Sequence, residues 1–324
     1  MEQRLRKMIE AAVNHRATDV HFQIRDHCVH VQMRKDGKLI DFPDAECDVK
    51  LFRYLQYRSN MELSKTGIPQ TGRFDMDISD RKVSLRFALI HSFQMTSGVL
   101  RILNAENTLT IDSVFLYPEH AYKIKQAFHR GSGLILLSGP TGSGKTTTLY
   151  TCLKSVNDRR VFTVEDPIEV YDESFVQLQI NEAQNLDYEA SIRQLMRHDP
   201  DIIMIGEIRD AKAAKGAVQS ALTGHLVAAT IHASSCIMAI ERMKELGISE
   251  MLLKDVLCLV SSQRLLSTIR KEKACAFEMM DLNDLSFYFA KHQLPASFHD
   301  LQTNVRWLEK QRIVSTFETE QMYP

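Results

Sequence analysis

The segment GPTGSGKT at 139–146 constrains what this chain can fold into more than any other feature. The apolar run GLILLS at 133–138 comes before it and is typical of a strand buried on both faces of a parallel sheet. A helix-compatible run, TTLYTCLKSV, comes after it. The complete G-x-x-x-x-G-K-T pattern therefore has the strand–loop–helix setting of a phosphate-binding loop. The sequence predicts an α/β domain built around this loop.

The chemistry of the loop follows from its residue types. Glycines let backbone N–H groups turn inward around phosphate oxygens, and the N-terminus of the next helix adds the positive end of its dipole. Lys145 is expected to reach the β- and γ-phosphates, and the Thr146 hydroxyl to bind Mg²⁺. ATP and Mg²⁺ are therefore the predicted ligands. The predicted nucleotide-binding residues are Gly139, Pro140, Thr141, Gly142, Ser143, Gly144, Lys145, Thr146 and Thr147.

Three further apolar runs, at 161–164, 202–205 and 226–231, resemble the strand before the loop. They alternate with helical stretches, which is the pattern of a parallel sheet wrapped by helices. Ligand sites of such sheets lie at the carboxyl ends of the strands. Glu165 and Glu207 each follow one of these runs. We therefore expect both carboxylates to lie beside the bound phosphates.

The strand before Glu207 departs from a common Walker B strand, because Gly206 stands where an aspartate often ends it. Glu207 is therefore predicted to act on the metal or on the attacking water. Taken alone, Glu165 and Glu207 are equally compatible with solvated loop residues. Taken alone, His225 and His232 are compatible with ordinary buried or surface histidines.

A smaller α+β domain is predicted to come before the phosphate loop. Its first segment places apolar residues on one helical face, namely Leu5, Met8, Ile9, Ala12 and Val13. Alternating apolar residues predict two β-hairpins, which turn at Asp36-Gly37 and at Ser79-Asp80. A helix is predicted between them, at about 46–59. The predicted organisation is an N-terminal domain at 1–104, a linker at 105–118 and a P-loop domain with a helical tail at 119–324.

Composition excludes several classes of protein. The formal net charge is −1 and no basic run stands out, so no direct nucleic-acid binding is expected. The six cysteines are scattered without a C-x-x-C pair, which argues against a disulfide framework and a structural zinc site. No apolar stretch approaches the roughly 18 residues of a transmembrane helix. Contact with a membrane is therefore expected to be peripheral or through a partner.

Four segments occur in an order that resembles a known family. They are GPTGSGKTTTLY, TVEDPIE, RQLMRHDPDIIMIGEIRD and TGHLVAATIHA. The set is similar to the type II secretion/type IV pilus ATPases of the GspE/PulE type. The resemblance implies a RecA-like P-loop domain preceded by a PAS-like α+β domain, and ATP hydrolysis. It also implies that Glu165 is the acid of the "Asp box", that Glu207 is the Walker B acid, and that His225 and His232 form a "His box" near the γ-phosphate.

The first domain shares this resemblance through ATDVHFQ and VQMRKDGKL. Arg86 and Arg101 line up with arginines that the family inserts into a nucleotide site, and Arg73 and Arg81 are weaker candidates. Arginine suits this task because its charge is fixed and its planar fork binds phosphate oxygens in pairs. The alternative is that these side chains simply form a solvated strand face.

The resemblance also implies an assembly and a cellular role. The family forms homo-hexameric rings, in which the first domain of one subunit packs on the second domain of another. They act at the cytoplasmic face of the membrane through a polytopic membrane partner. The first-domain signature is similar to competence-type members from Gram-positive bacteria, which drive a pseudopilus for DNA uptake. The first domain is expected to begin at once, without the extra N-terminal domain and the four-cysteine zinc insertion of assembly ATPases, which also fits retraction ATPases.

Several interpretations stay open at this point. The leading one is a motor that powers pilus-like assembly, and the first alternative is a retraction motor with the same chemistry. A nucleic-acid translocase would need basic or aromatic residues along a pore, and a nucleotide-gated scaffold would hydrolyse little ATP. The tail at 294–324 has Phe298, Leu301, Val305 and Leu308 at helical spacing. It is expected to pack on the second domain, or alternatively to dock a partner.

Overall fold

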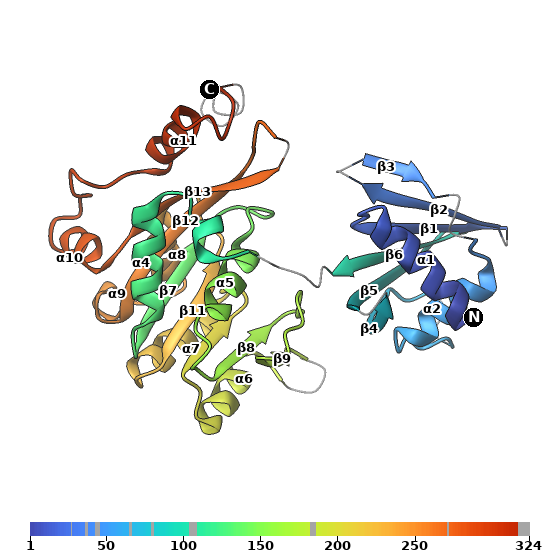
Figure 1. Cartoon of the computed structure of the whole chain (residues 1–324). Coiled ribbons are helices and arrows are strands. Elements are labelled where there is room, and N and C mark those ends of the chain that lie inside the picture. Colours follow the sequence, from blue (N-terminus) through green and yellow to red (C-terminus); the bar gives the residue numbers. More distant parts are fainter. Residues whose placement is uncertain are drawn as a thin grey trace. The chain divides into compact units, whose positions relative to one another are not determined.

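The structure is a computed structural model that describes residues 1–26, 28–35, 38–42, 46–64, 67–78, 81–103, 109–181, 186–270 and 272–316. The chain divides into two compact units (Figure 1). The first comprises Met1–Glu106 with Glu169–Tyr171, and the second comprises Asn107–Ile168 with Asp172–Pro324. Both predicted hairpin turns and the first residues of the predicted linker lie outside the described residues. Each unit has a hydrophobic core of its own.

The first unit is an antiparallel sheet covered by helices on one face. Its six strands have the order β3-β2-β1-β6-β5-β4, and α1 and α2 lie over one face (Figure 1). The bounds are α1 Glu2–Asn14, β1 Asp19–Arg25, β2 Cys28–Lys35, β3 Lys38–Asp41, α2 Val49–Arg58, β4 Gln70–Ile78, β5 Arg81–Ser92 and β6 Met95–Leu103. This architecture confirms the predicted α+β character.

Alternation of apolar residues explains why these segments form this sheet. In β1, Val20 and Phe22 are buried in the core, whereas His21 and Gln23 point to the other face. The buried face of α1 consists of Leu5, Met8, Ile9 and Ala12, as its helical spacing predicts. The apolar pattern predicts α1 and the two hairpins, whereas β1 was not predicted. The second face of the sheet, away from the helices, carries mainly polar side chains.

The second unit is a seven-stranded sheet between two layers of helices. Its strand order is β13-β12-β7-β11-β10-β8-β9, in which β13 alone pairs antiparallel. The strands are β7 Gly133–Ser138, β8 Val161–Glu165, β9 Val176–Gln179, β10 Ile202–Ile205, β11 Leu226–Ile231, β12 Leu257–Ser267 and β13 Lys273–Met280. The four predicted strands form its centre, and β9, β12 and β13 extend the sheet beyond the prediction. The chain therefore has the mixed α/β fold that the phosphate loop predicts.

Helices cover both faces of this sheet (Figure 1). One layer consists of α3 Ile111–Val114, α4 Pro118–Phe128 and α5 Lys145–Lys154. The other consists of α6 Tyr188–Leu195, the 3₁₀ turn η2 Met196–His198, α7 Ala211–Leu222, α8 Cys236–Glu245, α9 Glu250–Val256 and α10 Leu282–Lys291. The apolar side chains of the second layer join those of the strands in one large core. The central strands are thus fully buried, which explains their unbroken apolar runs.

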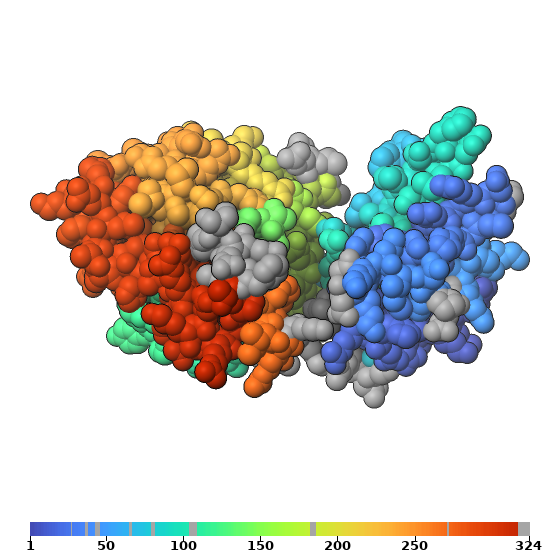
Figure 2. Space-filling view, turned by 90° about the horizontal axis from the view of Figure 1, so that it is seen from above, coloured from blue at the N-terminus to red at the C-terminus, as the bar shows by residue number. Residues whose placement is uncertain are grey.

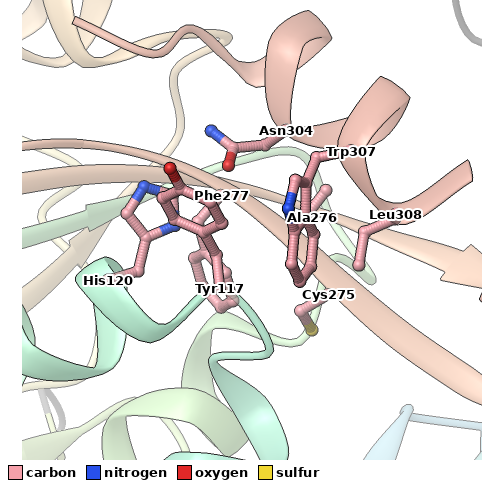
Figure 3. Close-up of a pocket in the computed structure, with 8 residues that line it drawn as sticks. All are labelled: Tyr117, His120, Cys275, Ala276, Phe277, Asn304, Trp307 and Leu308. Atoms are coloured by element: carbon pink, nitrogen blue, oxygen red, sulfur yellow. The ribbon is translucent and has the colours of Figure 1, made fainter. Parts of the chain in front are cut away.

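The last described helix, α11 Leu301–Lys310, packs on β13, so the predicted tail helix is confirmed. Figure 2 shows the C-terminal segments, coloured orange to red, at the surface of the second unit. Figure 3 shows a small pocket where α11 meets β13 and the start of α4. The space inside is about 10 Å³, which is the room of a single water molecule. The pocket is therefore too small for a nucleotide.

The buried Glu278 of β13 joins the starts of two helices. Its Oε1 accepts a hydrogen bond from the backbone N–H of Cys236 at 2.6 Å, and its Oε2 accepts one from Leu301 at 3.1 Å. These residues begin α8 and α11, so one carboxylate faces the positive ends of two helix dipoles. Burial raises the pKa of Glu278, against the effect of these two N–H groups.

His120, in the pocket of Figure 3, is expected to make stability depend on pH. Burial, and to a lesser extent the charge of Lys123, lowers the pKa of His120 from 6.5 to about 3. Between these pH values the unfolded chain binds a proton that the folded chain does not. The stability is therefore full above pH 6.5 and falls as the pH drops toward 3. At pH 5 the loss is about 2 kcal/mol, at about 1.36 kcal/mol per pH unit.

The single tryptophan, Trp307, lines the same pocket and provides the readout. Urea unfolding followed by its fluorescence at pH 7.5 and 5.0 should show a loss about 2 kcal/mol larger in the native sequence than in His120→Phe. His129→Phe, at the exposed end of α4, is the control for a histidine lost elsewhere. Equal losses in the native sequence and His120→Phe would contradict the assignment.

Candidate functional site

The loop between β7 and α5 has the backbone that a phosphate cradle requires. Gly139, Gly142 and Gly144 have φ values of 149°, 78° and 86°, in the region that favours glycine. A Cβ added to Gly139 would lie 2.6 Å from both the Gln263 carbonyl oxygen and the Ser143 hydroxyl. The glycines are thus required by the path of the chain. The ten-residue helix α5 begins directly after this loop, at Lys145.

Lys145 places its ammonium group over the loop. Its Nζ donates to the carbonyl oxygens of Gly139 at 2.9 Å and Pro140 at 3.0 Å, and the residue is buried. A cation held at a helix N-terminus, beside glycines that turn their backbone, is a site for a phosphate group. The residues of this loop therefore fit the triphosphate of a nucleotide. Thr146, next along α5, supplies the kind of oxygen ligand that Mg²⁺ binds.

Gln263 of β12 braces the loop from behind and was not predicted. Its Nε2 donates to the Ser143 carbonyl at 2.7 Å and to the Thr148 hydroxyl at 3.2 Å. The side chain is completely buried. Buried amides that are bonded in this way fix the groups they contact. We interpret Gln263 as a support that holds the loop against the sheet.

Parallel strands bring three of the predicted side chains to the edge of the sheet where the loop lies. Ile231 of β11 is paired with Ser138 of β7, and Ile205 of β10 is paired with Ala229 of β11. On the other side, Ile205 is paired with Val164 of β8. His232 follows β11 directly, Glu207 lies two residues after β10, and Glu165 is the last residue of β8. This edge is where ligands bind in parallel α/β sheets.

Glu207 and His232 are in direct contact. The Nε2 of His232 lies 2.7 Å from Oε1 of Glu207, and the Nε of Arg209 donates to its Oε2 at 2.6 Å. Arg209 also approaches Asp166, with 3.5 Å between Nη1 and Oδ2. The hydrogen bond with Glu207 raises the pKa of Arg209. Arg209 was not singled out from the sequence, although its position in GEIRD is close to Glu207.

Glu165 is buried, and hydrogen-bond donors hold it in place. Its Oε1 accepts from the Tyr150 hydroxyl at 2.7 Å and from the Thr163 hydroxyl at 2.6 Å, with Gln177 Nε2 at 3.3 Å. Tyr150 lies on α5, one helical turn after Thr146, so it lies on the same side of that helix. Burial, followed by the charge of Glu165, raises the pKa of Tyr150 far above its usual range. Tyr150 is thus a donor to Glu165 rather than a proton source.

The contact between Gly206 and Glu165 explains the unusual Walker B strand. A Cβ on Gly206 would lie 3.2 Å from Cγ of Glu165 and 3.3 Å from the Val164 carbonyl oxygen. These distances are tight for Cβ contacts, so the neighbouring atoms would have to shift by a few tenths of an ångström. An aspartate at 206 would therefore displace the side chain of Glu165. Gly206 thus stands in place of an acid beside β10, and the neighbouring strand β8 supplies the acid Glu165 instead.

The structure does not bring His225 to this edge, in contrast to the prediction that it lies near the γ-phosphate. His225 comes before β11, whose first residue, Leu226, is paired with Gly133 at the start of β7. The phosphate loop follows the other end of β7. At about 3.3 Å per residue, the length of β11 puts roughly 17 Å between the two ends. The His225 Nδ1 lies 3.2 Å from the Thr223 hydroxyl and 3.3 Å from the Ser220 carbonyl oxygen.

The predicted arginines belong to the first unit. Arg86 of β5 and Arg101 of β6 are directly opposite each other, and Arg73 of β4 is opposite Arg86. They share the face of the sheet that α1 and α2 do not cover. Arg81 begins β5, opposite Ile78, and its side chain lies outside the described residues.

Known proteins share both the sequence and the fold of this chain. A family model described as "Type II/IV secretion system protein" matches residues 1–305. The "Protein transport protein HofB homolog" of Escherichia coli K12 is 35% identical over 81% of this chain and 58% of its own length. The "Competence protein ComGA" of Bacillus subtilis 168 is 33% identical over 84% of this chain and 76% of its own length. The crystal structure of the pilus retraction motor PilT with bound ADP has a TM-score of 0.79 at 24% identity, over 99% of this chain and 97% of PilT.

The matches differ in how much of each protein they cover. The chain spans little more than half the length of the HofB homolog. The similarity to PilT establishes the fold. Among the helices that the structure describes, none has the length and apolar character needed to cross a bilayer. Because the family model covers nearly all of the chain and ComGA matches over three quarters of its own length, the chain belongs to the type II/IV secretion system protein family.

Proposed function

We propose that this chain is a motor ATPase, which hydrolyses ATP to ADP and phosphate to power assembly of a pilus-like or competence pseudopilus structure. The observation that carries the proposal is the gathering of the phosphate loop, Glu165 and the Glu207–His232 pair at one edge of the sheet. The relatives that match the chain work in protein transport, type II secretion and competence.

Each group at this edge receives a defined role. Residues 139–147 hold the triphosphate, with Lys145 neutralising its β- and γ-oxygens. Thr146 and Glu207 would hold Mg²⁺, which would offset the negative charge that builds up during phosphoryl transfer. Glu207 also orients the attacking water, and His232 holds the Glu207 carboxylate through their contact. Glu165, held by Tyr150 and Thr163, is the second acid of the site.

We further propose a homo-hexamer in which the first unit of one subunit serves the nucleotide site of another. Arg86 and Arg101 would then place two fixed positive charges on the phosphates. The ring would act from the cytoplasmic face of the membrane, through a polytopic platform protein. The support for this arrangement is the charged, helix-free sheet face of the first unit, whose arginines are complementary to the phosphates of a nucleotide held by another subunit.

Arg86→Ala is expected to reduce ATP turnover about 10³-fold or more while leaving the fold intact, because a phosphate-binding arginine acts on the transition state. Steady-state phosphate release and a thermal melt provide the measurement. Arg53→Ala, on the exposed side of α2, is the matched control and should retain turnover. If Arg86→Ala turns over ATP at the native rate, the arginine has no role in the reaction.

Deleting the gene in its host tests the direction of the motor. Loss of both surface pili or pseudopili and DNA uptake is the result expected for an assembly motor of the competence type. Retained or excess pili would assign the chain to retraction, with the same ATPase chemistry. Complementation with the Lys145→Ala variant is the control, and it should fail to restore the assembled structures.

A further inference from the structure

One row of five charged residues crosses the open face of the first sheet. The strand pairings place Arg34 of β2 opposite Asp19 of β1, and Asp19 opposite Arg101 of β6. Arg101 is opposite Arg86 of β5, which is opposite Arg73 of β4. We call these five residues the arginine row. Directly paired residues share one face of a sheet, so the row extends over roughly 19 Å at about 4.8 Å per strand.

The arginine row places like charges side by side. Arg101, Arg86 and Arg73 are consecutive across three strands, and like charges that are directly opposite destabilise a sheet. Asp19 is the one acid of the five. A row of this composition attracts an anion, and the planar forks of its arginines match phosphate oxygens.

Asp19 has a geometry that sets it apart from a surface acid. It is 5% exposed, whereas the Arg101 side chain is 52% exposed. The Asp19 Oδ1 accepts a hydrogen bond from Nε of Arg101 at 2.8 Å, and its Oδ2 accepts one from the Thr18 hydroxyl at 2.8 Å. Burial alone would raise the pKa of Asp19, but these two hydrogen bonds hold it below its usual value. Asp19 is therefore a buried anion beneath a half-exposed arginine.

The contact leaves a specific part of Arg101 available. A guanidinium group can bind an oxyanion through its Nε edge or through the edge formed by its two Nη atoms. Asp19 occupies Nε. Among the residues that the structure describes, Asp19 is the one hydrogen-bonded partner of Arg101. This contact through Nε leaves the two Nη atoms available, and the buried carboxylate restricts the rotation of the guanidinium.

We propose that Asp19 is the positioning residue of this enzyme's Arg101, and that it fixes the guanidinium so that its Nη edge meets a phosphate of ATP. The inference rests on the proposed role of Arg101 in ATP hydrolysis. Asp19 itself touches no substrate. It replaces the freedom of a long side chain with one orientation, which shortens the search for the transition-state geometry. Its negative charge also lies between the positive charges of Arg34 and Arg101 in the row.

Asp19→Asn tests the proposal because it keeps the shape and removes the charge. We expect kcat for ATP hydrolysis to fall by up to about 100-fold, the effect of misplacing a group at a reacting centre. The KM for ATP should stay near the native value, since the phosphate loop supplies most of the ground-state binding. Asp75→Asn is the matched control, because Asp75 lies on the same sheet face and is bonded to Ser84. Asp75→Asn should leave kcat unchanged.

A double-mutant cycle separates positioning from simple structural support. If Asp19 acts through Arg101, Asp19→Asn should cause no further loss of kcat in the Arg101→Ala background. If Asp19→Asn lowers kcat by the same factor in the native sequence and in Arg101→Ala, the proposal is overturned. Should Asp19→Asn unfold, Thr18→Val provides a milder variant, which removes the second hydrogen bond of Asp19 and should lower kcat less. Unchanged kcat in Thr18→Val would then count against the proposal.

The outcomes also separate this inference from the proposed function. If Arg101→Ala lowers kcat while Asp19→Asn does not, the role of Arg101 stands and the role of Asp19 fails. If Arg101→Ala leaves kcat unchanged, the role of Arg101 in hydrolysis fails, and the positioning role of Asp19 fails with it. Thermal melts of the full chain are expected to show reduced stability for Arg101→Ala, because the buried Asp19 loses the cation that pairs with it. The kcat values are therefore compared at a temperature at which every variant is fully folded, so that a change in kcat reports on the reaction.

Discussion

Replacing Lys145 by alanine is expected to abolish ATP turnover, with a loss of at least about 10²- to 10³-fold for one preorganised cation. The Lys145 ammonium lies against the carbonyl oxygens of Gly139 and Pro140, at the start of α5. Alanine removes the charge that faces the β- and γ-phosphates. Titration with a fluorescent ATP analogue and a phosphate-release assay measure binding and turnover separately, and both should be lost.

The control for Lys145→Ala lies on the same helix. Lys154 ends α5 and pairs with Asp172 at 2.7 Å. Lys154→Ala should therefore retain nucleotide binding, apart from a small effect on stability. If Lys145→Ala binds and hydrolyses ATP normally, the phosphate loop is not the site of the reaction and the proposed function fails with it.

Glu207→Gln is expected to bind ATP normally but to turn it over about 10²- to 10⁴-fold more slowly, the range for one well-placed catalytic group. Its Oε1 contacts His232 and its Oε2 accepts from Arg209. Glutamine keeps the size of the side chain but loses the negative charge that binds Mg²⁺ and attracts the proton of water. Single-turnover measurements separate this chemical step from product release.

Glu189→Gln is the matched control for Glu207→Gln, because Glu189 is an exposed acid that pairs with Arg193 on α6. It should leave turnover unchanged. Normal turnover in Glu207→Gln would point to Glu165 as the acid of the reaction. Glu165→Gln would then be expected to show the large loss, since it removes the negative charge that Tyr150 and Thr163 hold in place.

The sequence was sufficient to predict one edge of the sheet. The phosphate loop, Glu165, Glu207 and His232 each follow an apolar run, and parallel strands necessarily end at the same edge. This inference needs the direction of each strand but not its exact neighbours. The missing aspartate at Gly206 was visible in the sequence, whereas its reason was not. That reason is the side chain of Glu165 on a neighbouring strand.

The position of His225 shows why the two histidines of one sequence motif need not lie at the same site. His225 and His232 are close in the sequence and belong to one resemblance, yet a strand lies between them. An extended strand separates its two ends by its full length, whereas a loop or helix of the same number of residues would keep them closer. Only the position of β11 between these histidines decides which one reaches the loop.

The features of the site that the sequence did not predict depend on contacts between segments that are distant in the chain. Gln263 reaches Ser143 from a strand that the sequence did not reveal, and Tyr150 finds Glu165 through the packing of α5 on the sheet. The arginine row depends on the register of five strands, and a shift of one residue in any pairing would turn a member to the other face. Local patterns contain no information about that register, so Asp19 could not be distinguished from a surface acid.

The contacts of Glu278 decide how the C-terminal part of the chain can be labelled or shortened in an experiment. A label joined after residue 316 leaves the N–H of Leu301 on the Glu278 carboxylate. A chain shortened ahead of α11 removes that donor, and the N–H of Cys236 must hold the buried charge without it. Cys236 begins α8 just beyond His232, so trimming one terminus disturbs the nucleotide edge of the sheet. Inactivity of a shortened chain would therefore say little about whether its terminus recruits other proteins.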